Sequence, residues 1–134
     1  MTLSTAPSQQ PVLLSVVELG GYGDLTPLYK RLGFSVTSVT SSRKAISAVK
    51  KLRPDVVVAE FNHQSNFRDR TSTLESLLAA IERFADTRAI VFYEKETLPQ
   101  LEKLLTQFNV FGTMAYPLDE AELVSLLQSA QQHD

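Results

Sequence analysis

Cysteine is absent from this chain of 134 residues. That absence excludes disulfide bonds, iron–sulfur clusters, thiolate metal sites and cysteine nucleophiles. Glycine and proline are scarce, with 5 and 6 residues, and hydrophobic residues make up 43% of the chain. This composition is typical of a globular domain and excludes collagen-like, disordered and coiled-coil proteins. Because a chain without disulfides fits a reducing compartment, we expect a cytoplasmic protein.

Neither sign of charge dominates, since 13 Lys and Arg stand against 15 Asp and Glu, for a formal net charge of -2. Without a basic excess we expect no direct binding to nucleic acid. The apolar runs have the length of strands, far from the roughly 20 residues that cross a membrane, so we expect no membrane span. The length suits one domain. We expect it over residues 11–130, between a disordered polar leader (1–10) and a polar tail (131–134).

Strand and helix patterns alternate along the whole chain. Apolar or alternating segments of strand length predict strands at 12–17, 34–40, 55–61, 88–93 and 110–116. Between and after them, apolar residues at helical spacing predict helices at 26–32, 41–53, 72–84, 97–108 and 119–127. Thr26, Thr97 and Asp119 are expected to cap three of these helices.

This order predicts a parallel sheet between two layers of helices, because right-handed crossovers connect successive strands. The second strand alternates apolar and polar residues, as an edge strand does, whereas the first, third and fourth are almost continuously apolar. We therefore predict a flavodoxin-like (βα)5 three-layer α/β sandwich with strand order 2-1-3-4-5.

In such a sheet, ligands and chemistry gather at the carboxyl ends of the strands. The residues expected there are Glu18, Glu60, Tyr93, Glu94, Tyr116 and Pro117. Three of them are carboxylates that we expect to converge, joined by Asp24 if the glycine-rich loop folds back.

Two segments carry a resemblance to a known family. Residues 41–60, SSRKAISAVKKLRPDVVVAE, resemble the second helix and third strand of the receiver domain of two-component response regulators. Residues 116–127, YPLDEAELVSLL, resemble the junction into its last helix, and the likeness extends over residues 11–130. The resemblance implies a phosphoacceptor Asp ending strand three and a magnesium-binding acidic pair ending strand one. It also implies a Thr or Ser ending strand four and a Lys before the Pro that follows strand five.

The chain departs from that pattern at each of these positions. Glu60 stands in the phosphoacceptor place, Glu18 is a single acid, Tyr93 or Glu94 replaces the hydroxyl residue, and Tyr116 replaces the Lys. The chain thus resembles a degenerate pseudo-receiver. We predict a non-catalytic regulatory module without a cofactor, which acts through protein–protein interaction independently of aspartyl phosphorylation.

Other functions stay open at this point. A receiver-like sensor could bind a small ligand or a divalent cation in the acidic cleft, with Glu18 and Glu60 as weak metal candidates. A phospho-switch that uses Glu60 or Asp69 is a third possibility. Glu60 itself is either a permanent stand-in for a phosphorylated Asp or an ordinary solvated carboxylate.

Two features of the expected rim are ambiguous. The segment GGYG after strand one is either a phosphate cradle or, more often for such a pattern, a simple tight turn. Tyr116–Pro117 is expected to be a cis peptide bond, with the Tyr116 ring covering the rim. His63 is expected in a polar loop and His133 in the tail, so neither predicts a catalytic or metal site.

Two surfaces are candidate interfaces. The last strand and last two helices, with Leu98, Phe111 and Met114, could form a homodimer or hold a partner, or be a solvated surface. Phe67 and Arg68 in the polar loop before the third helix are a second candidate contact, with disorder as the alternative.

Overall fold

The computed structural model describes residues 10–62 and 73–131. The predictions for the leader and the tail, and those for His63, Phe67, Arg68 and Asp69, lie outside these ranges.

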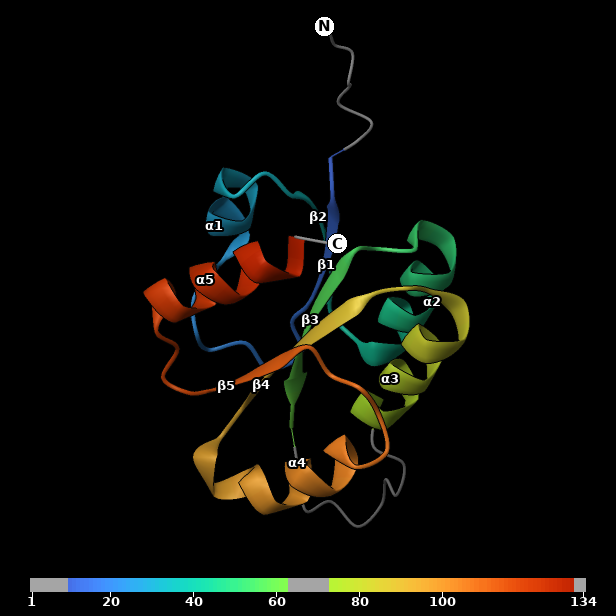
Figure 1. The fold of residues 1–134 in the computed structure, drawn as a ribbon, viewed down its shortest axis with the longest axis vertical. Coiled ribbons are helices and arrows are strands. Elements are labelled where there is room, and N and C mark those ends of the chain that lie inside the picture. The colour runs from blue at the N-terminus through green and yellow to red at the C-terminus, as the bar shows by residue number, and fades with distance from the viewer. Residues whose placement is uncertain (1–9, 63–72, 132–134) are drawn as a thin grey trace, which may run out of the picture.

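Five parallel strands form one sheet in the order β2-β1-β3-β4-β5 (Figure 1). The strands are β1 (Val12–Val16), β2 (Ser35–Val39), β3 (Val56–Phe61), β4 (Arg88–Tyr93) and β5 (Gly112–Ala115). The predicted fold class and strand order are confirmed. The strands β2 and β5 at the two edges are shorter than predicted.

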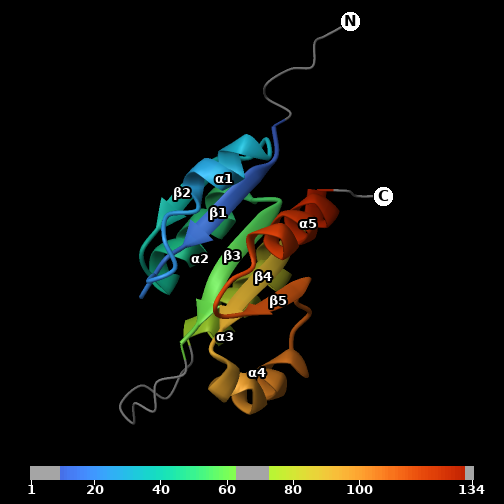
Figure 2. The same cartoon turned by 90° about the vertical axis from the view of Figure 1, so that its left-hand side faces the viewer.

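Helices cover both faces of the sheet. They are α1 (Thr26–Arg31), α2 (Ser42–Leu52), α3 (Thr73–Phe84), α4 (Leu98–Leu105) and α5 (Glu120–Gln131), with a 3-10 turn η3 (Lys95–Thr97) before α4. Helices α1 and α5 lie on one side of the sheet, and α2 and α3 lie on the other (Figures 1 and 2). In the described part of the chain, no helix has the length and apolar character needed to cross a membrane.

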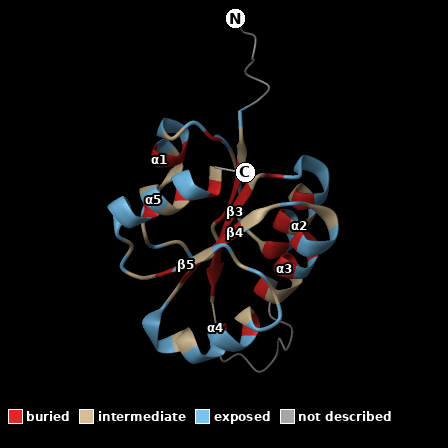
Figure 3. Ribbon diagram, in the orientation of Figure 1, coloured by how far each residue is buried: buried red, intermediate tan, exposed pale blue. Residues whose placement is uncertain are grey.

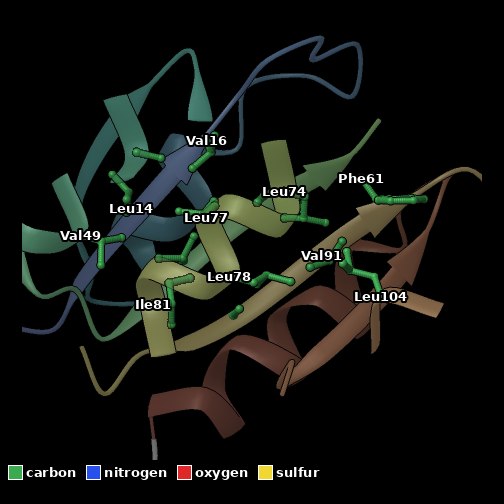
Figure 4. Packing of buried hydrophobic residues seen from close by; sticks show 14 of the residues in the cluster. Leu14, Val16, Val49, Phe61, Leu74, Leu77, Leu78, Ile81, Val91 and Leu104 are labelled. Atoms are coloured by element: carbon green, nitrogen blue, oxygen red, sulfur yellow. The ribbon is translucent and has the colours of Figure 1, made fainter. Parts of the chain in front are cut away.

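The central strand β3 explains why both faces are covered. Val57, Ala59 and Phe61 point into the cluster beneath α2, α3 and α4, whereas Val56 and Val58 point into the cluster beneath α1 and α5. Successive side chains of a strand point to opposite faces, so an apolar strand needs helices on both. Burial is concentrated in β1, β3 and β4 and on the inner sides of α2 and α3 (Figure 3). Figure 4 shows leucines of α3 packed between α2 and the sheet.

The predicted caps differ in outcome. Asp119 Oδ1 accepts the Glu122 backbone N–H at 3.1 Å, which confirms that cap. Thr26 is not a cap, because α1 begins at Thr26 itself and the Asp24 carboxylate accepts its N–H at 3.0 Å. Thr97 precedes α4, but its hydroxyl donates to the Glu94 carbonyl at 2.8 Å and does not cap the helix.

Candidate functional site

Glu60 lies at the carboxyl end of β3 and is 3% exposed. It follows Val56 and Val58 at two-residue spacing, so its side chain lies on the α1–α5 side of the sheet. The interpretation of Glu60 as a solvated carboxylate is therefore wrong. A buried carboxylate needs donors around it, because loss of hydration without hydrogen bonds is costly.

Three consecutive backbone groups of the loop between β1 and α1 supply such donors. The N–H of Leu19 donates to Glu60 Oε1 at 2.9 Å. The N–H groups of Glu18 and Gly20 donate to Oε2, each at 3.2 Å. These bonds join the carboxylate of β3 to the loop that leaves β1, across 40 to 42 residues of sequence.

Two glycines turn the chain directly after these donors. Gly20 and Gly21 have φ of 68° and 91°, values that residues with a Cβ rarely adopt. The successive N–H groups before the turn converge on one point, which is how backbone forms an anion-binding concavity. The segment GGYG contributes the Gly20 N–H and the Tyr22 hydroxyl to this arrangement, and the anion that they bind is the protein's own Glu60 rather than a phosphate.

Two side chains complete the coordination of Glu60. The Tyr22 hydroxyl donates to Oε2 at 2.9 Å, and the Asn62 amide donates to Oε1 at 3.0 Å. With the three backbone donors, five hydrogen bonds converge on this carboxylate. Sequence reasoning missed Tyr22 and Asn62 as partners of Glu60.

Glu18 lies two residues beyond β1 and faces a different set of donors. Its carboxylate accepts from the Ser42 hydroxyl at 3.2 Å and from the Asn62 amide at 3.4 Å. Asn62 therefore bridges Glu18 and Glu60, which separates the two negative charges by a shared donor.

Aromatic rings cover the Tyr22 side of the site. Tyr22 stacks on Tyr116, with centroids 5.8 Å apart and planes inclined by 18°. It also meets the edge of Phe92, the fully buried β4 residue opposite Glu60 in the sheet, at 5.3 Å and 84°. The Tyr116–Pro117 peptide bond is cis, as predicted. The Tyr116 ring thus contacts the rim from the β5–α5 junction.

The three predicted carboxylates do not converge. Among the described residues, no group of three or more His, Cys, Asp or Glu side chains could hold a metal ion. Glu18 and Glu60 lie side by side through Asn62, but Glu94 is exposed at the start of η3. The reason is that Glu60 turns toward the backbone of the β1–α1 loop instead of toward β4.

Glu94 lines an open groove beside Tyr22 and Tyr116. The groove has a volume of about 610 Å³ and is lined by Gly20, Gly21, Tyr22, Glu94, Tyr116, Pro117 and Leu118. Tyr93, predicted in the cleft, does not line it. Its side chain packs instead against the cluster on the α2–α3 side, because it lies one position along β4 from Phe92.

One predicted interface residue is part of the core. Met114 is 7% exposed and belongs to the cluster beneath α1 and α5, so it does not form a surface for a partner. Its side chain faces inward because it lies opposite Phe92 in the sheet. Phe111 is 39% exposed, with the Arg88 guanidinium 5.4 Å from its ring centroid, and Leu98 is half-buried.

Three tyrosines should ionise at a higher pH in the folded protein than in the unfolded chain. Burial is the main cause that raises the pKa of Tyr22, Tyr29 and Tyr116 above the ordinary value of about 10, and Glu60 adds to it for Tyr22 and Tyr116. Their contribution to stability is therefore complete below about pH 10 and lost as the pH rises further, since only the unfolded chain ionises readily there. A tyrosinate absorbance titration should show fewer tyrosines ionised near pH 10 than in urea. Equal titration curves with the fold intact would contradict this.

No family model and no curated protein matches the chain. Solved structures resemble it over nearly its whole length. A CheY-like response regulator receiver domain from Methylobacillus flagellatus has a TM-score of 0.70 at 20% identity, covering 90% of this chain and 98% of that one. A LuxR-family DNA-binding response regulator from Staphylococcus aureus has a TM-score of 0.73 at 16% identity, with 91% and 99% covered. The chain has the receiver-domain fold.

A third structure with the receiver fold bears on the site. It is the receiver domain of the sensor histidine kinase PA1611 from Pseudomonas aeruginosa, with a TM-score of 0.70 at 18% identity, covering 92% of this chain and 99% of that one. That protein has a magnesium ion coordinated in its active-site cleft. In the present chain, the carboxyl end of β3 instead holds a carboxylate bound by N–H and O–H donors.

Proposed function

We propose that this chain is a regulatory module with a receiver fold that signals through contact with a protein partner or a second copy, independently of aspartyl phosphorylation. The observation that supports this most strongly is the state of Glu60. Its carboxylate is 3% exposed, and both of its oxygens accept hydrogen bonds from the chain itself. A carboxylate in that state is a poor nucleophile for an incoming phosphoryl group.

Among the residues that the structure describes, the groups around Glu60 offer a phosphoryl group little of the stabilisation that its transfer needs. Phosphoryl transfer depends on cations and preorganised donors that neutralise the transferring oxygens, and loss of one such donor costs roughly 100-fold to 1000-fold in rate. Tyr116 occupies the position before Pro117 where the resembled family has a Lys, and its ring lies against Tyr22. The three N–H donors of the β1–α1 loop are already used by Glu60.

The test is incubation of the full chain with acetyl phosphate and magnesium, followed by intact-mass measurement. We expect no gain of a phosphoryl group. The matched variant Glu60→Asp supplies the family's acceptor residue, and we expect it to stay unmodified too, because the Lys and the acidic pair are still missing. A stable phosphoryl adduct mapped to Glu60 in the wild-type chain would overturn the proposal. Sedimentation and partner capture test the second part of the proposal, that the chain acts through protein contacts. The sedimentation profile and the captured partners should be the same with and without the phosphodonor.

A second candidate function is sensing of a small ligand, and the groove of about 610 Å³ beside Tyr22 and Tyr116 favours it. Two adjacent phenol rings offer a surface on which a planar molecule could stack. A ligand whose amide shifts in an NMR titration are confined to the groove would support sensing. Magnesium is the corresponding probe for a cation, and the absence of shifts at Glu18 and Glu60 would exclude a site there.

A further inference from the structure

We propose that residues 18–22 form a carboxylate receptor and that the Glu60 side chain is its resident ligand. The inference rests on the hydrogen bonds of the loop and not on the proposed function, so it holds whether or not the chain binds a partner. The proposal is that the β1–α1 loop binds a small carboxylate group. In the wild-type chain, the Glu60 side chain occupies that site.

The arrangement of donors matches a single carboxylate group. Oε1 accepts from the Leu19 N–H, and Oε2 accepts from the N–H groups of Glu18 and Gly20 and from the Tyr22 hydroxyl. Both oxygens thus accept hydrogen bonds from one short segment, with donor–acceptor distances between 2.9 and 3.2 Å. Such distances are those of good hydrogen bonds.

The receptor works through neutral dipoles. In the described part of the chain, no Lys or Arg forms an ion pair with Glu60. The ion pair that the described residues do form joins Arg31 to Glu120 on the surface, at 3.4 Å. Converging backbone N–H groups hold an anion without a formal positive charge, as they do in other anion-binding turns. The loop's own carboxylate, Glu18, does not compete, because it faces Ser42 and Asn62.

Truncation of the ligand gives a direct test. Glu60→Ala removes Cγ and the carboxyl group, and acetate consists of the same heavy atoms. If the loop is a receptor, acetate should occupy the vacated space and satisfy the N–H groups, whereas the wild-type chain should ignore acetate because Glu60 already fills the site. Binding to the folded state alone raises its thermal midpoint.

The experiment compares thermal unfolding and amide NMR spectra in sodium acetate and in sodium chloride at equal ionic strength. For Glu60→Ala we expect acetate to raise the midpoint by about 3 °C or more and to shift the amides of residues 18–20. The wild-type chain and Glu102→Ala, which removes an exposed carboxylate from α4, should show neither effect. The control separates receptor binding from a general effect of lost negative charge.

Two outcomes would overturn the proposal. One is that Glu60→Ala responds to acetate no more than Glu102→Ala does. If Glu60→Ala does not fold in chloride, it is refolded from urea in each salt, and the proposal requires recovery of folded protein in acetate. The second outcome that would contradict the proposal is that acetate yields no more folded Glu60→Ala protein than chloride does.

Discussion

Glu60→Gln should lower the free energy of unfolding by about 2–4 kcal/mol, because the substitution replaces an acceptor with a donor at the centre of five hydrogen bonds. A glutamine amide has one oxygen that accepts and one NH₂ that only donates. Whichever way the amide turns, the NH₂ faces at least one backbone N–H of the loop: that of Leu19 at the Oε1 position, or those of Glu18 and Gly20 at the Oε2 position. Urea denaturation of the two proteins measures the difference.

The control for this prediction is Glu102→Gln, which makes the same chemical change on the exposed side of α4. Substitutions of that kind usually change stability by less than about 0.5 kcal/mol. If Glu60→Gln falls in the same range, the hydrogen bonds of Glu60 do not hold the loop in solution.

Phe92→Ala should lower the free energy of unfolding still further, by about 3–5 kcal/mol. Phe92 is fully buried in β4 and meets both Tyr22 and Tyr116, so the truncation opens a cavity and removes two ring contacts at once. Urea denaturation measures the loss of stability. Near-ultraviolet circular dichroism should show that the tyrosines lose their fixed environment.

A matched truncation tests whether position decides the effect. Phe111→Ala removes the same ring from a site that is 39% exposed, and we expect it to cost less than about 2 kcal/mol. If the two variants lose the same free energy of unfolding, the burial of Phe92 beneath the site does not explain its contribution to stability.

Most of the fold could be predicted because its signals are local. The unbroken run Val56–Ala59 marks a strand with both faces buried, and the alternation in Ser35–Val39 marks an edge. Ends of elements were less predictable. Thr26 and Thr97 have the composition of caps, but a nearby carboxylate and a backbone carbonyl provide the hydrogen bonds that settle the actual geometry.

The site was predictable in its location but not in its contacts. The strand ends brought Glu18, Glu60 and Tyr116 to one rim, as parallel strands must. What the Glu60 carboxylate binds depends on where the N–H groups of residues 18–20 point. The backbone dihedral angles of Glu18 and Leu19 set those directions, and no local sequence pattern marks them. The two-residue spacing from Val58 does place Glu60 on the side of α1, a signal that the sequence contains.

The most direct test of this account is amide hydrogen exchange at Glu18, Leu19 and Gly20. Leu19 is 68% exposed as a residue, and its N–H donates to Glu60 at 2.9 Å, so the exchange rate of this amide reports on that hydrogen bond. If Glu60 binds these N–H groups in solution, all three should exchange slowly in the wild-type chain, and at least one of them should exchange rapidly in Glu60→Gln, while the amides of β3 stay protected in both. Exchange of all three amides at the rate of an unstructured peptide in the wild-type chain would contradict the account.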